Sequence, residues 1–176
     1  MSDLERAVAT VVRECMGVRP GEDVLVVCNP ATHELAERLR AEAGAAGADA
    51  MLMLTEEREQ HGQEPPAAVA AAMARADVVL VPTVKSLSHT AARREACEAG
   101  ARIATFPGVT ADMLARVMSA DMGELRRRGA EVARRLTEAH EARITCANGS
   151  DLRLSLRGRE AIPDAGALQE RGAFGN

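Results

Sequence analysis

Short apolar runs alternate along the chain with segments that have the spacing of amphipathic helices. The apolar runs lie at residues 23–28, 50–55, 77–82 and 102–105. Uninterrupted runs of this length are typical of strands that are buried on both faces of a parallel sheet. Helices are predicted over residues 3–16, 30–43, 66–75, 89–98 and 120–139, with a further helix after Thr110. The alternation predicts an α/β fold with a doubly wound, mostly parallel, Rossmann-like sheet that is flanked by helices.

Residues with strong capping preferences mark the ends of several of these helices. Asn29 is a good N-cap, and Pro30 is favoured at the first helical position. Ser88 is predicted to cap the helix that Gly100 ends, and Thr110 is predicted to cap the next helix. These signals indicate where each helix follows its strand.

The pattern changes near the end of the chain. Residues 143–146 and 152–156 alternate apolar and polar positions, and Asn148-Gly149 lies between them. Asn-Gly between two alternating runs predicts a β-hairpin. Residues 160–176 have little periodicity, and we expect them to form an exposed or incomplete segment.

This change of pattern predicts two parts. Residues 1–140 are expected to form the Rossmann-like domain. Residues 141–176 are expected to form the β-hairpin and the start of a truncated second domain.

Composition narrows the class of protein. The 176 residues are 47% hydrophobic, which allows a sizeable core, and only 1% aromatic, which leaves no platforms for stacking on bases. The net charge of -4 argues further against a nucleic-acid partner. No apolar run is long enough to cross a bilayer, and the N-terminus lacks the pattern of a signal peptide. We therefore expect a cytoplasmic protein with no membrane partner, whose four cysteines are reduced.

Several catalytic motifs are missing. The turn after the first strand, residues 28–33, contains no glycine, so the dinucleotide-binding fingerprint is absent. Lys85 is the only lysine, and no glycine-rich phosphate loop precedes it. His33 and Glu37 share one helix face but have no third ligand nearby, so a solvated pair is the favoured interpretation. We predict no catalytic residue and no metal ligand in this chain.

Donor-bearing residues gather where the third apolar run leads into a helix. They are Lys85, Ser86, Ser88, His89 and Thr90. Ligands of open α/β sheets bind outside the carboxyl ends of the strands, and the free N–H groups of a helix start attract anions. These residues could form a pocket wall that holds a carboxylate or a polar substrate group. The other interpretation is a well-capped helix with a solvated lysine, which spacing alone favours by a modest margin.

An ordered set of stretches extends over nearly the whole chain. It consists of residues 17–26, 62–66, 76–82, 85–90, 92–96, 100–104, 108–113 and 158–176. In this order the stretches resemble the thermophilic metallo-aminopeptidase family, which contains aminopeptidase T and aminopeptidase S and is leucyl aminopeptidase-like. The resemblance implies a hydrolase that removes N-terminal residues from peptides, with divalent metal ions (zinc, cobalt or magnesium), as a homodimer.

The resemblance also implies which part of such an enzyme this chain is. The family pairs an N-terminal α/β domain with a C-terminal domain that holds the metal ligands, and one ligand is the Glu of a Pro-x-Gly-Glu stretch. That stretch would follow Asn176, so we expect a truncated N-terminal part that binds no metal and is inactive alone. Residues 85–90 would then cover one wall of the peptide cleft.

Two further hypotheses are open. The chain could be a stand-alone α/β module that binds a small molecule without catalysis. It could also be a relative with different metal chemistry, such as the ring-opening dioxygenation of a hydroxypyridine, which these residues do not exclude.

Overall fold

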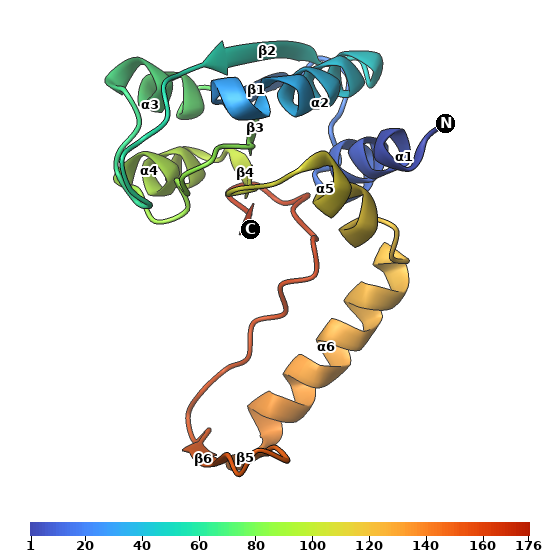
Figure 1. Cartoon of the computed structure of the whole chain (residues 1–176), viewed down its shortest axis with the longest axis vertical. Coiled ribbons are helices and arrows are strands. Elements are labelled where there is room, and N and C mark those ends of the chain that lie inside the picture. Colours follow the sequence, from blue (N-terminus) through green and yellow to red (C-terminus); the bar gives the residue numbers. More distant parts are fainter. The chain divides into compact units, whose positions relative to one another are not determined.

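The computed structural model describes residues 1–176 and contains a five-stranded parallel sheet and a separate antiparallel hairpin (Figure 1). The sheet has the strand order β2-β1-β3-β4-β7. Its strands are β1 (Asp23–Cys28), β2 (Asp49–Leu54), β3 (Val78–Val81), β4 (Arg102–Thr105) and β7 (Phe174–Gly175). The hairpin consists of β5 (Glu141–Thr145) and β6 (Asp151–Ser155). The predicted fold class is therefore confirmed.

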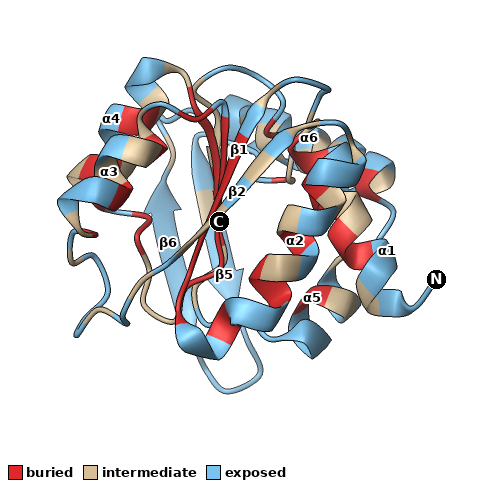
Figure 2. Cartoon of the chain, turned by 90° about the horizontal axis from the view of Figure 1, so that it is seen from above, coloured by how far each residue is buried: buried red, intermediate tan, exposed pale blue.

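Helices cover both faces of the sheet. Figure 2 shows α3 and α4 on one side of the central strands and α1, α2 and α5 on the other. The helices are α1 (Asp3–Ala9), continued by a π-helical turn (Thr10–Cys15); a 3-10 turn (Pro30–Thr32) that leads into α2 (His33–Ala45); and α3 (Ala67–Met73), α4 (Ala91–Ala99), α5 (Ala111–Val117) and α6 (Met122–Glu138). No helix has the combination of length and apolar content that a membrane span requires.

The apolar runs of β1, β3 and β4 are uninterrupted because both faces of these inner strands are buried. The expectation of burial on both faces is wrong for β2, an edge strand on which Met51 and Leu54 are 45% and 54% exposed. Val24 and Val26 pack with the helices α1 and α2, whereas Leu25 and Val27 pack with α3 and α4. All four side chains are at most 1% exposed. Successive strand side chains point to opposite faces, so an alternating apolar and polar pattern would place polar groups in one of the two cores.

The end of the chain returns to the sheet. The N–H of Ile103 donates to the carbonyl of Ala173 at 2.9 Å, and the N–H of Leu168 donates to the carbonyl of Cys15 at 3.0 Å. A Cβ at Gly172 would lie 2.9 Å from the carbonyl oxygen of Cys97, so this position requires a glycine. The expectation of an exposed or incomplete segment over 160–176 is therefore wrong for its last part, because β7 forms by pairing with a strand distant in sequence.

The chain divides into two compact units. One consists of Met1–Ala120 and Gly166–Asn176, and the other of Asp121–Ala165. The second unit therefore contains α6 together with the hairpin. The predicted domains 1–140 and 141–176 stay a prediction, and these compact units divide the chain at other residues.

The second unit has exposed ion pairs along α6 and exposed apolar side chains on its hairpin. Glu131 accepts hydrogen bonds from Arg134 and Arg135 on the next turn of α6, and these lower the pKa of its carboxyl to about 2. In the hairpin, Ile144 and Leu152 pair on one face and are 55% and 50% exposed. A helix with a two-stranded hairpin has too few layers to bury such side chains.

A buried ion pair closes the amino-terminal edge of the sheet. Arg102, the first residue of β4, donates through Nη1 and Nη2 to the two carboxylate oxygens of Glu22, at 3.0 and 2.7 Å. Its Nε also donates to the carbonyl of Met16 at 3.2 Å. The side chain of Arg102 is only 5% exposed, so the pair joins β4, the turn before β1 and the end of the first helix in a region that excludes most water.

We predict that Arg102→Met lowers the free energy of unfolding by about 3–5 kcal/mol, because it leaves the Glu22 carboxylate partly buried without its cation. The double variant with Glu22→Gln should lose less than the sum of the two single changes. Urea denaturation measures both. Arg116→Met, which removes one half of an exposed ion pair with Asp112, is the matched control and should cost less than about 1 kcal/mol. Equal losses in the two arginine variants would contradict a special role for Arg102.

Glu22 also predicts a pH dependence of stability. Burial by itself raises the pKa of this carboxyl, but hydrogen bonds from Arg102 and from the N–H of Arg19 outweigh it, so the pKa lies below its ordinary value of 4.5. A lowered pKa stabilises the folded state above the unfolded pKa, and this contribution is lost as the pH falls through the folded pKa. We expect the difference in unfolding free energy between the wild type and Glu22→Gln to decrease as the pH falls below 4.5. A difference that stays constant from pH 7 to the acid limit of folding would contradict it.

Candidate functional site

Asn29 joins three strand ends at the carboxyl edge of the sheet. It follows β1 directly and is 2% exposed. Its Oδ1 accepts a hydrogen bond from the N–H of Val84, after β3, and its Nδ2 donates to the carbonyl of Thr55, after β2, both at 2.9 Å. Because the chain leaves β1 for β2 on one side and returns to β3 on the other, this is the switch point of the sheet. Ligands of open α/β sheets bind at such a point.

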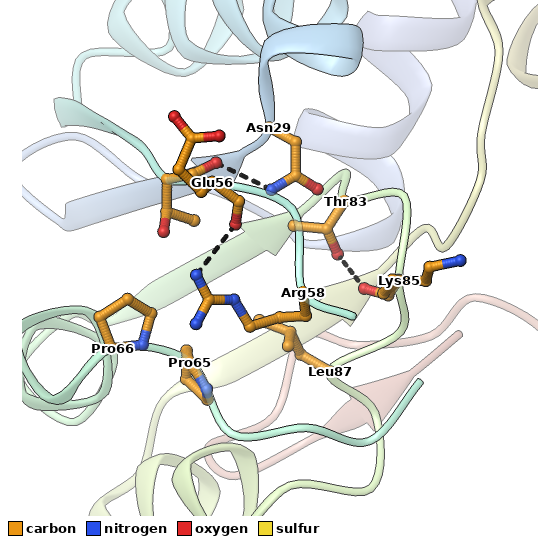
Figure 3. Close-up of a pocket in the computed structure, with 9 residues that line it drawn as sticks. Asn29, Glu56, Arg58, Pro65, Pro66, Thr83, Lys85 and Leu87 are labelled. Atoms are coloured by element: carbon orange, nitrogen blue, oxygen red, sulfur yellow. Dashed lines mark hydrogen bonds between the residues drawn. The ribbon is translucent and has the colours of Figure 1, made fainter. Parts of the chain in front are cut away.

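A small pocket opens beside Asn29 (Figure 3). The enclosed space in it is about 10 Å³, which is room for about one water molecule. The lining residues are Asn29, Thr55, Glu56, Arg58, Pro65, Pro66, Thr83, Lys85 and Leu87. We call this the switch-point pocket. The loops after β1, β2 and β3 all contribute to it, which agrees with its place at the carboxyl edge.

The predicted site residues lie on the loop after β3, and their side chains have different surroundings. Lys85 and Leu87 line the switch-point pocket. The Nζ of Lys85 is 3.8 Å from Oε1 of Glu57, so its charge is balanced by a neighbouring loop. Ser86 and Ser88 form hydrogen bonds elsewhere, and His89 is exposed.

Ser86 and Ser88 belong to a chain of hydroxyl groups. The hydroxyl of Ser86 donates to Oγ of Ser88 at 2.7 Å, and Oγ of Ser88 lies 2.9 Å from Oγ1 of Thr105. Thr105 in turn donates to Oδ1 of Asn176 at 2.9 Å. The hydroxyl chain therefore links the loop after β3 to the carboxyl ends of β4 and β7, and these two serines hold the edge in place.

The start of α4 differs from the prediction. Thr90 caps this helix by accepting from the N–H of Arg93 at 3.2 Å, so α4 begins at Ala91, whereas Ser88 was predicted to cap a helix over 89–98. The prediction of Ser88 as the cap is wrong because its hydroxyl takes part in the hydroxyl chain.

The anion site expected at this helix start is filled from within the chain. The carboxylate of Glu64 accepts from the N–H groups of Ala91 and Ala92 at 2.5 and 3.1 Å. A carboxylate at a helix N-terminus is stabilised by the helix dipole. These N–H groups are therefore not available to a ligand carboxylate, and the part of the prediction that depended on them is corrected.

The structure adds residues that sequence reasoning did not assign to the site. Nδ1 of His61, in the loop after β2, accepts from the N–H of Ser86 at 3.1 Å. Asn29 and Thr105 were treated as a cap and a strand residue. The signal that could have found them is their position: each lies at the carboxyl end of a predicted strand, where polar side chains meet.

The residues of this chain do not fit a metal centre. No group of three His, Cys, Asp or Glu side chains comes together with the geometry to hold a metal ion. Burial raises the pKa of the Cys28 thiol, to which the Glu37 carboxylate adds, and burial also raises the pKa of Cys97. Both thiols are therefore poor sources of the thiolate that metals and electrophiles need.

Comparison with protein families decides between the hypotheses. Residues 3–176 match the model of the NicX family, described as 2,5-dihydroxypyridine 5,6-dioxygenase. The chain belongs to this family. The prediction of a metallo-aminopeptidase, and with it of a hydrolase and protease, is therefore wrong as the main interpretation. The alternative that named a relative of hydroxypyridine dioxygenases agrees with the family.

Solved structures show the same fold. The structure of 2,5-dihydroxypyridine dioxygenase from Pseudomonas putida KT2440 is similar, with a TM-score of 0.76 and 18% identity, over 99% of this chain and 54% of that chain. AmpT from Thermus thermophilus is similar with a TM-score of 0.54 and 17% identity, over 87% of this chain and 53% of that one. The resemblance to aminopeptidase T is thus supported at the level of the fold. No match was found among the curated proteins. The chain spans about half the length of the two solved structures.

We predict that Asn29→Ala destabilises the chain by about 1–3 kcal/mol, because the N–H of Val84 and the carbonyl of Thr55 both lose their partner. Urea denaturation of the variant measures the loss. Asn148→Ala, in the exposed turn of the hairpin, is the control and should change stability by less than about 0.5 kcal/mol. If the two alanine variants are equally stable, Asn29 does not join the strand ends in the way described.

Proposed function

We propose that this chain is the sheet-bearing part of a dioxygenase that opens the ring of a dihydroxypyridine. The observation that supports this most strongly is the family match over residues 3–176. The solved dioxygenase with a TM-score of 0.76 supports the same assignment through its fold.

The chemistry of such a substrate fits the groups at the carboxyl edge. A dihydroxypyridine is flat and carries two ring hydroxyls and a ring nitrogen, so it needs a few hydrogen-bonding groups that fix its orientation. The loop from Lys85 to Thr90 brings such groups to this edge, and His89 is the most exposed of them. We propose that this loop forms one wall of the substrate site, and that the imidazole of His89 binds a substrate hydroxyl.

A 5,6-dioxygenase breaks the bond between C5 and C6 of the ring and adds both atoms of dioxygen. We propose that the full enzyme uses a divalent metal for this reaction. Residues 1–176 do not supply a set of ligands for it, so we place the ligands outside these residues and assign no step of the reaction to a metal here. The predictions of a homodimer and of no nucleic-acid partner stay predictions.

The proposed function predicts that the full polypeptide encoded by the reading frame that contains these residues consumes 2,5-dihydroxypyridine and dioxygen in equal amounts. The measurement combines an oxygen electrode with the loss of the ultraviolet absorbance of the aromatic ring, after incubation with Fe²⁺, Mn²⁺ or Zn²⁺ in separate arms. Leucine p-nitroanilide serves as the substrate for the rejected peptidase activity. Hydrolysis of this compound without any ring opening would overturn the proposal.

The same assay tests the proposed wall. His89→Ala should raise KM for the pyridine at least tenfold, because it removes a group that binds the substrate. Arg75→Ala is the control, since Arg75 is exposed and precedes β3 at the opposite edge of the sheet. Equal KM values in the two variants would show that His89 does not contact the substrate.

A further inference from the structure

The loop after β2 holds the start of the segment that contains His89. Figure 1 shows this loop running from β2 toward α4 before the chain enters α3. Ser86 contacts the loop through both of its backbone groups. Its N–H donates to Nδ1 of His61 at 3.1 Å, and its carbonyl accepts from the N–H of Gly62 at 2.8 Å. Gly62 has a φ of +81°, a left-handed conformation that favours glycine, in the turn that presents this N–H.

The same loop also holds the end of the segment. The carboxylate of Glu64 accepts from the N–H groups of Ala91 and Ala92, at the start of α4, at 2.5 and 3.1 Å. We call residues 61–64 the strap. The side chains of His61 and Glu64 therefore both bind backbone N–H groups of residues 86–92, one at each end of this segment.

His89 lies between the two held ends and has buried residues on both sides. Leu87 and Ser88 are 2% exposed and Thr90 is 1% exposed, whereas His89 is exposed. The carbonyl of Ser88 accepts from Nε of Arg93 at 2.8 Å. The hydroxyl of Thr90 donates to the carbonyl of Leu87 at 2.8 Å. The backbone on each side of His89 is therefore fixed, and the imidazole is the exposed group of this stretch.

The bond to Ser86 requires a particular form of the His61 imidazole. Because Nδ1 accepts a hydrogen bond, it carries no hydrogen, and the neutral ring has its hydrogen on Nε2. A doubly protonated imidazole donates from both nitrogens and has no acceptor for the N–H of Ser86. An asparagine at this position would keep an acceptor, since its Oδ1 is bonded to Cγ as Nδ1 is in histidine. An alanine would leave none.

A group that binds a substrate needs supporting residues that fix its orientation without contacting the substrate themselves. We propose that His61 and Glu64 are positioning residues, which hold His89 in the orientation in which it binds a hydroxyl of the substrate. This inference rests on the proposed function, because it requires His89 to contact the dihydroxypyridine.

Kinetics of the full polypeptide with 2,5-dihydroxypyridine test the inference. Glu64→Ala and His61→Ala should each raise KM about fivefold with little change in kcat, because a displaced imidazole binds the substrate less well. His61→Asn should keep KM within about twofold of the wild type, since its Oδ1 can accept from Ser86. Glu59→Ala is the matched control and should leave KM unchanged. Glu59 is an exposed glutamate of the same loop and contributes a backbone N–H to its turn.

Two further measurements distinguish positioning from a general loss of structure. In the His89→Ala background, Glu64→Ala should change KM by less than about twofold, since the group that Glu64 positions is gone. Hydrogen exchange of the peptide 84–93 needs no activity. Its amides should exchange about tenfold faster in Glu64→Ala and His61→Ala than in the wild type, and at the wild-type rate in Glu59→Ala.

The outcomes separate this inference from the proposed function. A wild-type polypeptide that opens no ring would overturn the proposed function, and the exchange rates would still show whether the strap holds residues 86–92. With ring opening present, three results would each overturn the positioning role. They are unchanged KM in both alanine variants, an equal rise of KM when Glu64→Ala is added to His89→Ala, and exchange that stays at the wild-type rate.

Discussion

Burial of both faces of the inner strands β1, β3 and β4 is the constraint on which the rest of this structure depends. Helices α1, α2 and α5 cover one face and α3 and α4 cover the other, so these strands have almost no place for a polar side chain except at their ends. Polar groups are therefore confined to the two edges of the sheet. At the amino-terminal edge the pair of Arg102 and Glu22 joins elements of the fold. At the carboxyl edge the loops bring together the groups that can bind a ligand.

Most polar groups at the carboxyl edge satisfy one another. Asn29 joins the loops after β2 and β3, Glu64 occupies the N-terminus of α4, and the hydroxyl chain ends at Asn176. Such networks hold a site rigid but leave few donors for a ligand. One group stands apart, the exposed imidazole of His89. This is why the proposed substrate contact rests on this residue.

The family match and the solved structures together indicate that proteins with different chemistry share this fold. A dioxygenase and AmpT both have folds similar to this chain, at 18% and 17% identity. One of the stretches that resembled an aminopeptidase contains Gly100, whose left-handed backbone ends α4. A fold does not specify a reaction, and it was the match to the family model that contradicted the aminopeptidase prediction.

Sequence alone determined the parallel α/β sheet and the approximate place of nearly every helix and strand, because both depend on local periodicity and capping. It also placed Lys85 to Thr90 at the carboxyl edge. Only the tertiary structure decided that Ser88 takes part in the hydroxyl chain while Thr90 caps α4, and that Glu64 fills the helix start. It alone decided that β7 pairs with β4. These features join residues distant along the chain, and local sequence patterns carry no information on which distant group satisfies a given donor or acceptor.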